Sequence, residues 1–114
     1  MTLIPIANDK EMLSFRFRKA DYFVFLDEDK MHIEENPHKT SKSPVFFDYF
    51  LTLGIDTLYI KALGYKTFVK LFGLNIKVYF IPDITHWNEI KKDKLILITK
   101  ENAKFYCTLG HTSI

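Results

Sequence analysis

The sequence has few of the residues that build covalent frameworks and nucleotide-binding loops. A single cysteine, Cys107, excludes an intrachain disulfide framework. The four glycines stand at positions 54, 64, 73 and 110, too far apart for a Walker loop or a G-x-G-x-x-G turn. No serine lies in a G-x-S-x-G turn. These absences argue against nucleotide cradling and covalent catalysis, so we expect a protein that is not an enzyme.

The chain also lacks a large excess of charge and any long apolar run. Sixteen Lys and Arg against fourteen Asp and Glu give a formal net charge of +2. This is too small to hold a polyanion by counterion release alone, so no nucleic acid is expected as a partner. No stretch approaches the roughly 18 uncharged apolar residues of a membrane span, and the start shows no signal-peptide pattern. Because N-x-[ST] sites are also missing, the sequence favours a cytoplasmic protein with no membrane partner.

Aromatic residues, in contrast, are abundant. They make up 16% of the chain, with eleven Phe and six Tyr, which is typical of a small domain with a core of large rings. A length of 114 residues is enough for one domain with a substantial core. We predict a single domain over residues 1–100 and a flexible C-terminal tail over residues 101–114, because the tail shows no periodicity.

The first third of the chain shows strand patterns. Apolar runs at 3–7 and 22–26 and an alternating segment at 31–34 each have strand length. A short acidic turn separates the last two, which predicts a hairpin. Pro5 cannot donate a ladder hydrogen bond, so local rules place the first strand at a sheet edge or give it a bulge.

The second half alternates between helix and strand patterns. Segments 43–54 and 64–73 carry apolar residues at helical spacing and end at a glycine, and the first begins with a Ser-Pro pair that favours a helix start. Strand-length apolar runs occur at 56–60 and 76–81, and a short helix is expected at 84–90. This order predicts an α/β domain.

A cationic segment follows the first predicted strand. Arg16 and Arg18 alternate with Phe15 and Phe17, and Lys19 adds a third cation. In an extended segment both guanidinium groups would project from one face while both rings pack inward. Arginine suits forked contacts with a multiply charged anion, so this is a candidate anion site. On strand periodicity alone, a solvated outer face is the more common interpretation.

Candidate metal ligands are few. His32 and His38 are six positions apart, which matches no standard zinc spacing. Cys107 and His111 would share a face if the tail were helical, yet two ligands do not make a closed site. We keep His38, Cys107 and His111 as candidate metal ligands. The acidic residues 27–29 are explained as a solvated turn.

Several short motifs resemble those of a known family. They are LIPIAND, FRKADYFVFLD, ENP at 35–37, FFDYFLTLGIDTLYIKALGYKTFVKLFGLNIKVY and KDKLILIT. In this order and spacing, over about residues 2–100, they resemble the dinitrogenase iron-molybdenum cofactor biosynthesis family, small domains found in nitrogenase cofactor carriers. The resemblance implies a ribonuclease H-like α/β fold flanked by about three helices. Its five-stranded mixed sheet would have the order 3-2-1-4-5, with strand 2 antiparallel and the Pro5 strand central.

The resemblance also implies where a ligand lies. Family members typically show His-Phe-Gly-Arg-Ala after the first strand, in a loop associated with the cluster pocket. Here the loop reads RFRKA, so arginines replace the His and the Gly. Losing the imidazole removes a metal ligand, but an anionic cluster would still be attracted by the cations and by amide hydrogens of the next helix start. The candidate site comprises Arg16, Phe17, Arg18, Lys19, Ala62, Leu63 and Gly64.

The function implied is that of a non-enzymatic binding or carrier protein. Its cargo would be an anionic metal–sulfur cluster of the iron–molybdenum type, or a precursor of it, and its other partners would be cofactor-assembly proteins. A monomer or weak homodimer is expected. The alternative is a ligand-free interaction or regulatory module on the same fold, and a small metal-dependent hydrolase is a weaker third. A nuclease is not expected because no acidic residue precedes Asp9 in the first strand.

Overall fold

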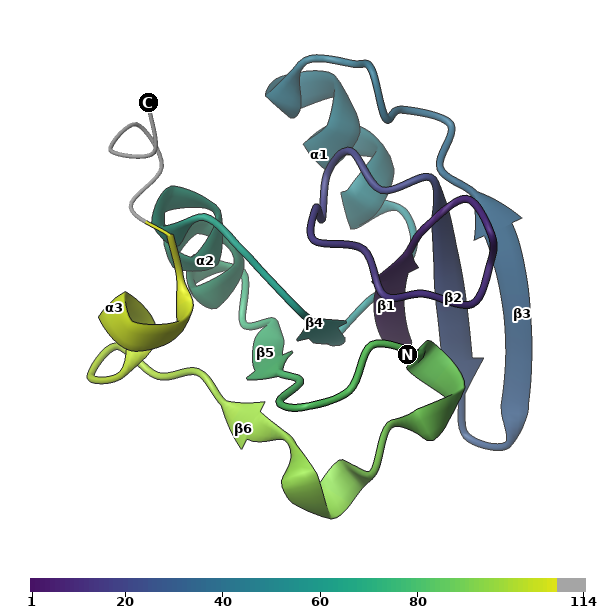
Figure 1. The fold of residues 1–114 in the computed structure, drawn as a ribbon. Helices are drawn as coiled ribbons and strands as arrows, with labels where there is room; N and C mark the ends of the chain where they lie inside the picture. Colours follow the sequence, from purple (N-terminus) through teal and green to yellow (C-terminus); the bar gives the residue numbers. More distant parts are fainter. Residues whose placement is uncertain (109–114) are drawn as a thin grey trace.

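The computed structural model describes residues 1–108 and consists of a mixed β-sheet with helices packed on it (Figure 1). Within this range the strands are β1 (Thr2–Ile6), β2 (Tyr22–Asp27), β3 (Lys30–Glu35), β4 (Thr57–Ile60), β5 (Lys77–Phe80) and β6 (Ile96–Leu97). The helices are α1 (Ser43–Leu51), α2 (Tyr65–Gly73) and α3 (Ala103–Tyr106), and two 3-10 turns lie at Trp87–Glu89 and Lys92–Lys94. None of the helices in residues 1–108 has the length and apolar character that a membrane crossing requires.

The predicted order of the first five strands is confirmed, whereas the predicted number of strands is wrong. The sheet has the order β3-β2-β1-β4-β5-β6. β2 pairs antiparallel with β1 and β3, and the β1–β4 and β4–β5 pairs are parallel. The sixth strand contributes only Ile96 and Leu97, antiparallel to β5. Two residues are too few for strand alternation to appear in the sequence, so only the pairing reveals this strand.

Pro5 lies in a central strand, and the expectation of an edge strand or a bulge is wrong. The register between β1 and β2 is continuous over all five residues of β1. The Pro5 carbonyl accepts a hydrogen bond from the backbone N–H of Ser14 at 3.1 Å. Because the nitrogen and oxygen of one strand residue face the same side, the missing N–H of Pro5 removes no bond to β2. The pairing with β4 covers only the first two residues of β1, so it loses nothing either.

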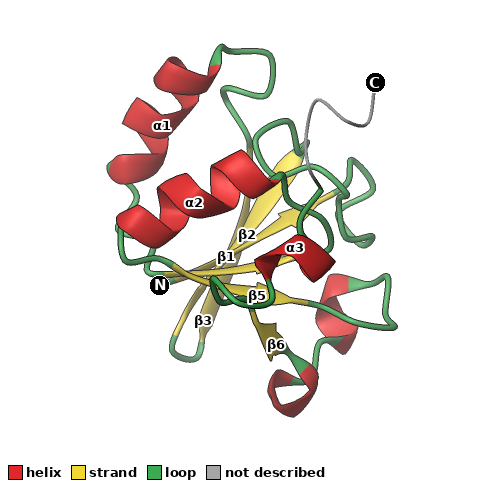
Figure 2. Cartoon of the chain, turned by 90° about the vertical axis from the view of Figure 1, so that its left-hand side faces the viewer, coloured by secondary structure: helices red, strands yellow, loops and turns green. Residues whose placement is uncertain are grey.

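Two apolar clusters pack on the two faces of the sheet. Figure 2 shows α1 and α2 together on one side. Side chains alternate along each strand, so that Phe23 and Phe25 of β2 join the helix-side cluster while Val24 joins the other. The chain after β5, with Trp87 and Ile90, covers the second face. The helix-side cluster includes Phe46, Phe47 and Phe50 of α1 and Phe68 and Leu71 of α2.

Residues 101–108, predicted to begin a flexible tail, pack against the domain instead. Ala103 is fully buried and Cys107 is 6% exposed, both in the helix-side cluster. Thr108 exchanges backbone hydrogen bonds with the residues on either side of Gly64. A small residue and a thiol four positions apart give no hydrophobic periodicity, so this docking could not be read from the sequence. The remainder of the predicted tail lies outside the described residues.

We expect Phe46→Ala to lower the free energy of unfolding by about 3–5 kcal/mol, because removing a fully buried ring leaves a cavity. Phe105→Ala is the matched control, since that ring is 86% exposed, and its effect should stay within about 0.5 kcal/mol. Urea denaturation measures both. Equal losses for the two variants would contradict the core described above.

Candidate functional site

The three predicted cations lie in the loop that joins β1 to β2. This loop is not the extended segment that the alternation predicted, because Leu13 forms only an isolated bridge to Ile6 and the chain then turns. Phe17 is 4% exposed, whereas Phe15 is 65% exposed. The prediction that both rings pack inward is therefore wrong for Phe15. The turn breaks the two-residue period on which that prediction depended.

The ring of Phe17 anchors the loop to α1. It lies 5.3 Å from the ring of Phe46 and 5.4 Å from that of Phe50, at interplanar angles of 85° and 87°. Edge-to-face pairs of this kind add to the free energy gained by burying the rings. The anchored ring stands between Arg16 and Arg18 in the chain, so both arginines are held at a fixed place next to the start of α1.

Asn36 is a second anchor, and the sequence analysis missed it. Among residues 1–108 it is the one buried polar residue, with 3% of its surface exposed. Its Nδ2 donates to the carbonyl oxygens of Arg18 and Ala20, both at 2.9 Å, and its Oδ1 accepts from the N–H of His38 at 2.9 Å. The amide thus fastens the cationic loop to the chain after β3. Asn36 belongs to the ENP motif noted in the sequence. Nothing in that polar stretch indicates that the side chain of this asparagine is buried.

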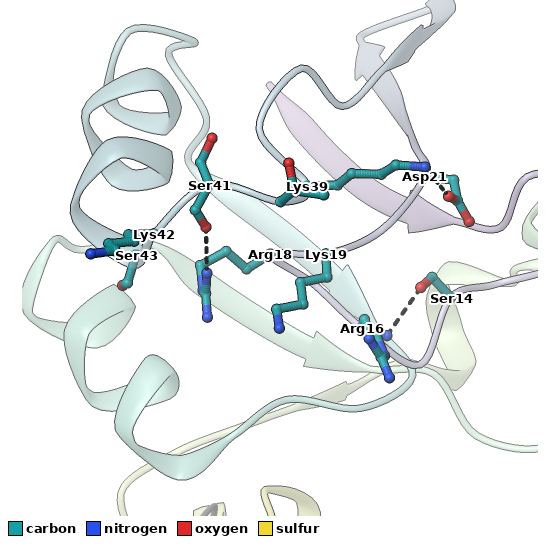
Figure 3. A pocket seen from close by; sticks show the side chains of 10 residues that line it. Ser14, Arg16, Arg18, Lys19, Asp21, Lys39, Ser41, Lys42 and Ser43 are labelled. Atoms are coloured by element: carbon teal, nitrogen blue, oxygen red, sulfur yellow. Dashed lines mark hydrogen bonds and ion pairs between the residues drawn. The ribbon is translucent and has the colours of Figure 1, made fainter.

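Two open hollows flank the cations. The α2 hollow, of about 520 Å³, lies at the start of α2. Its lining includes all seven residues of the predicted site, together with Phe15, Thr67 and Thr108. The α1 hollow, of about 880 Å³, lies between the cationic loop and the start of α1 (Figure 3). Arg16, Arg18 and Lys19 border both hollows. The structure therefore brings the predicted residues together, while their role in binding stays a prediction.

The charges of the two arginines are not neutralised within residues 1–108. The ion pairs found there involve other groups, and next to the loop Lys39 pairs with Asp21 at 2.8 Å. That hydrogen-bonded contact raises the pKa of Lys39. Arg18 Nη1 donates to the carbonyl oxygen of Ser41 at 3.1 Å, which orients the guanidinium. Figure 3 shows Arg16, Arg18 and Lys19 extending to one side of the loop, an arrangement that attracts an anion.

The turn before α2 supplies one wall of the α2 hollow and part of its backbone. Gly64 is the N-cap residue of α2, and no side chain caps the helix there. The N–H of Tyr65 is already engaged, because it donates to the carbonyl oxygen of Thr108 at 2.7 Å. Among the described residues, a Cβ added to Gly64 would meet only the hydroxyls of Thr67 and Thr108, both at 4.0 Å. The wall is thus open enough to take a side chain without a clash.

The candidate metal ligands do not form a set within the described residues. His38 Nδ1 lies 3.0 Å from the hydroxyl of Ser41, and its ring lies 5.0 Å from that of Tyr49. Burial of Cys107 in the core raises its thiol pKa to about 11, which disfavours the thiolate that binds metals. Among residues 1–108 no three His, Cys, Asp or Glu side chains are grouped to hold a metal ion, and His111 lies outside this range. The role of Cys107 as a metal ligand stays a prediction.

We expect Asn36→Ala to lower the free energy of unfolding by about 2–3 kcal/mol, because it leaves buried backbone groups without hydrogen-bond partners. The control is Asn88→Ala, whose side chain is exposed and whose effect should be within about 0.5 kcal/mol. Urea denaturation of both variants tests this. An Asn36→Ala protein as stable as the control would mean that the amide does not anchor the loop.

Cys107 should react slowly with iodoacetamide in the folded protein. A pKa of about 11 instead of 9.0 lowers the thiolate fraction at pH 8 by about 100-fold. We therefore expect labelling to be at least about 100-fold slower than in urea, and the difference to shrink as the pH rises toward 11. Mass spectrometry follows the reaction. Equal rates with and without urea at pH 8 would show an accessible thiol.

Comparison with known proteins identifies a solved structure with a similar fold but does not assign the chain to a family. No family model matches the chain, and a search of curated proteins also returns no match. Among solved structures, an NMR structure of a Thermotoga protein, named as a candidate NifB protein of the DUF35 family, has a TM-score of 0.56. The two chains are 24% identical over 75% of this chain and 77% of the other. At this identity the likeness shows a shared mixed α/β fold.

Proposed function

We propose that the protein is a non-enzymatic binding or carrier protein for an anionic metal–sulfur cluster, of the iron–molybdenum type or a precursor of it. The observation that carries the proposal is the α2 hollow, where Arg16, Arg18 and Lys19 meet with no carboxylate partner among residues 1–108. The order of the sequence motifs supports membership of the dinitrogenase iron-molybdenum cofactor biosynthesis family. The fold shared with a candidate NifB protein is consistent with it.

The lining of the α2 hollow suits such a cargo. The guanidinium groups of Arg16 and Arg18 can donate charge-assisted hydrogen bonds to sulfide or oxygen atoms of an anion. Phe15, which is 65% exposed, adds an apolar surface on the same lining. A hollow with cations and an apolar ring would both attract an anionic cluster and cover part of it.

Retention by charge rather than by coordination follows from the donor set. Residues 1–108 offer no group of three metal-binding side chains, so in this proposal charge attraction and hydrogen bonds hold the cluster. Such contacts exchange without breaking a metal–ligand bond, which suits a protein that hands its cargo on. They also weaken as ionic strength rises, because salt screens exposed charges.

The wider setting is part of the same proposal. The partners would be the cluster and cofactor-assembly proteins, with neither nucleic acid nor a membrane involved. The protein would act in the cytoplasm as a monomer or weak homodimer. No catalytic step is assigned to it.

One observation favours the alternative of a ligand-free interaction or regulatory module. Phe105 is 86% exposed and Phe15 is 65% exposed, and exposed aromatic rings often mark a surface for a protein partner. In this alternative the fold would be kept while the cargo is lost.

Anaerobic reconstitution separates the two proposals. The protein is incubated with iron, sulfide and molybdate, and gel filtration is followed by metal analysis of the protein peak. We expect metal to elute with the wild type, and Arg16→Ala with Arg18→Ala to lower the retained metal at least about tenfold. Lys91→Ala with Lys92→Ala is the control, because it removes the same charge from exposed side chains outside both hollows.

The melting temperature of each variant shows whether a loss of metal comes from the binding site or from unfolding. The double arginine variant should fold normally, since Arg16 is exposed and Arg18 loses one hydrogen bond, worth about 1 kcal/mol. Metal retained equally by both double variants would reject the arginine site. Wild-type protein that stays free of metal under every condition would favour the interaction module.

A further inference from the structure

We propose that the α1 hollow is a separate binding site for a compact polyvalent oxyanion made of linked tetrahedral groups, of which inorganic triphosphate is the simplest example. Its proposed ligand differs from the cluster cargo of the α2 hollow, although both sites use the same three cations of the loop. The two hollows share Arg16, Arg18 and Lys19 but differ in every other lining residue.

The chemistry of the two linings differs. The α2 hollow includes apolar residues such as Phe15, Ala62 and Leu63. The α1 hollow is lined only by charged and hydroxyl-bearing side chains. No aromatic or aliphatic side chain is among these lining residues, so apolar contacts there are limited to the methyl and methylene groups of polar side chains. Hydroxyl and ammonium donors instead match the hard oxygen atoms of phosphate-type groups.

The charge of the α1 hollow is strongly unbalanced. Two lysines, Lys39 and Lys42, add to the three cations of the loop. Its one acidic side chain, Asp21, is paired with Lys39 at 2.8 Å and so leaves the other cations without a partner there. A group with several linked negative charges can contact more than one of these cations at once, whereas a singly charged anion leaves most of the charge unbalanced.

Arg18 is oriented for such a ligand before it binds. Its guanidinium is partly buried and donates from Nη1 to the carbonyl oxygen of Ser41. The remaining N–H groups are available for a forked contact with an oxyanion. Because the side chain is already held, less conformational entropy is lost on binding than for a free surface lysine.

The start of α1 adds hydroxyl donors and a favourable field. Ser43, the first residue of α1, lines the hollow beside Ser41. Within the described part of the chain no side chain caps this nine-residue helix, and its first turn carries no acidic residue. An anion there interacts favourably with the helix dipole, in addition to the side-chain cations.

The test uses isothermal titration calorimetry of the full chain with sodium triphosphate at low ionic strength. Ser43→Asp and Thr67→Asp form a matched pair, because each adds one carboxylate to the first turn of a nine-residue helix, one in each hollow. An acidic residue there is compatible with folding. We expect Ser43→Asp to weaken binding at least about tenfold, and Thr67→Asp to weaken it clearly less, because its carboxylate lies in the other hollow and reaches only the shared cations.

A gain of affinity provides a second readout that misfolding could not produce. Asp21→Asn removes the one carboxylate that residues 1–108 place in the hollow and releases Lys39, so triphosphate should bind about threefold to tenfold tighter. Asp93→Asn removes the same charge from an exposed turn outside the hollow and should leave binding unchanged.

Other anions and outcomes define what would overturn the site. Orthophosphate and molybdate, titrated separately, should bind at least about tenfold more weakly than triphosphate, because each places fewer charges in the hollow. Failure of the wild type to bind triphosphate would overturn the proposal, as would equal losses in Ser43→Asp and Thr67→Asp. The cluster proposal is tested separately by the metal content of reconstituted Ser43→Asp protein. This variant should retain metal whether or not it binds triphosphate.

Discussion

The place of the cationic loop depends on the burial of one ring, Phe17, among the phenylalanines of α1 and β2. The ring lies edge-on to Phe46 and Phe50 and also near Phe23. Phe17 is the residue between Arg16 and Arg18, so its burial fixes the backbone positions from which both arginine side chains extend. The amide of Asn36 fastens the same loop from the other side by binding two of its carbonyl oxygens. The packing of Phe17 on α1 and β2 and the hydrogen bonds of Asn36 therefore place the cationic loop between the two hollows.

The magnitudes explain why the loop can hold three cations that repel one another. Two like charges about 4 Å apart in water repel by about 1 kcal/mol, charges farther apart repel less, and salt lowers the repulsion further. Burial of one phenylalanine side chain contributes about 1.5–3 kcal/mol, and each hydrogen bond of Asn36 about 1 kcal/mol. The anchors therefore outweigh the repulsion. These anchors fix the backbone of the loop, while the exposed side chains of Arg16 and Lys19 extend into solvent, which screens their repulsion.

The sequence predicted the elements whose residues have a regular period, together with the place of the cations. The hairpin of β2 and β3 and the glycine-bounded α2 follow from local patterns. The difference between Phe15 and Phe17 could not be predicted, because the two rings are chemically identical and only one meets α1. Asn36 was missed for a similar reason, since burial of a single polar side chain depends on contacts far apart in the sequence.

The chain contains only two arginines, Arg16 and Arg18, which allows a direct test of the anion site. Their side-chain Nε–Hε groups give two NMR signals that single substitutions assign without ambiguity. We predict that titration with tetrathiomolybdate, an anionic metal–sulfur probe, shifts both signals saturably and together, and that added salt reverses the shift. Signals that stay unmoved while the probe binds elsewhere, or that move independently of each other, would contradict a site formed by the paired guanidinium groups.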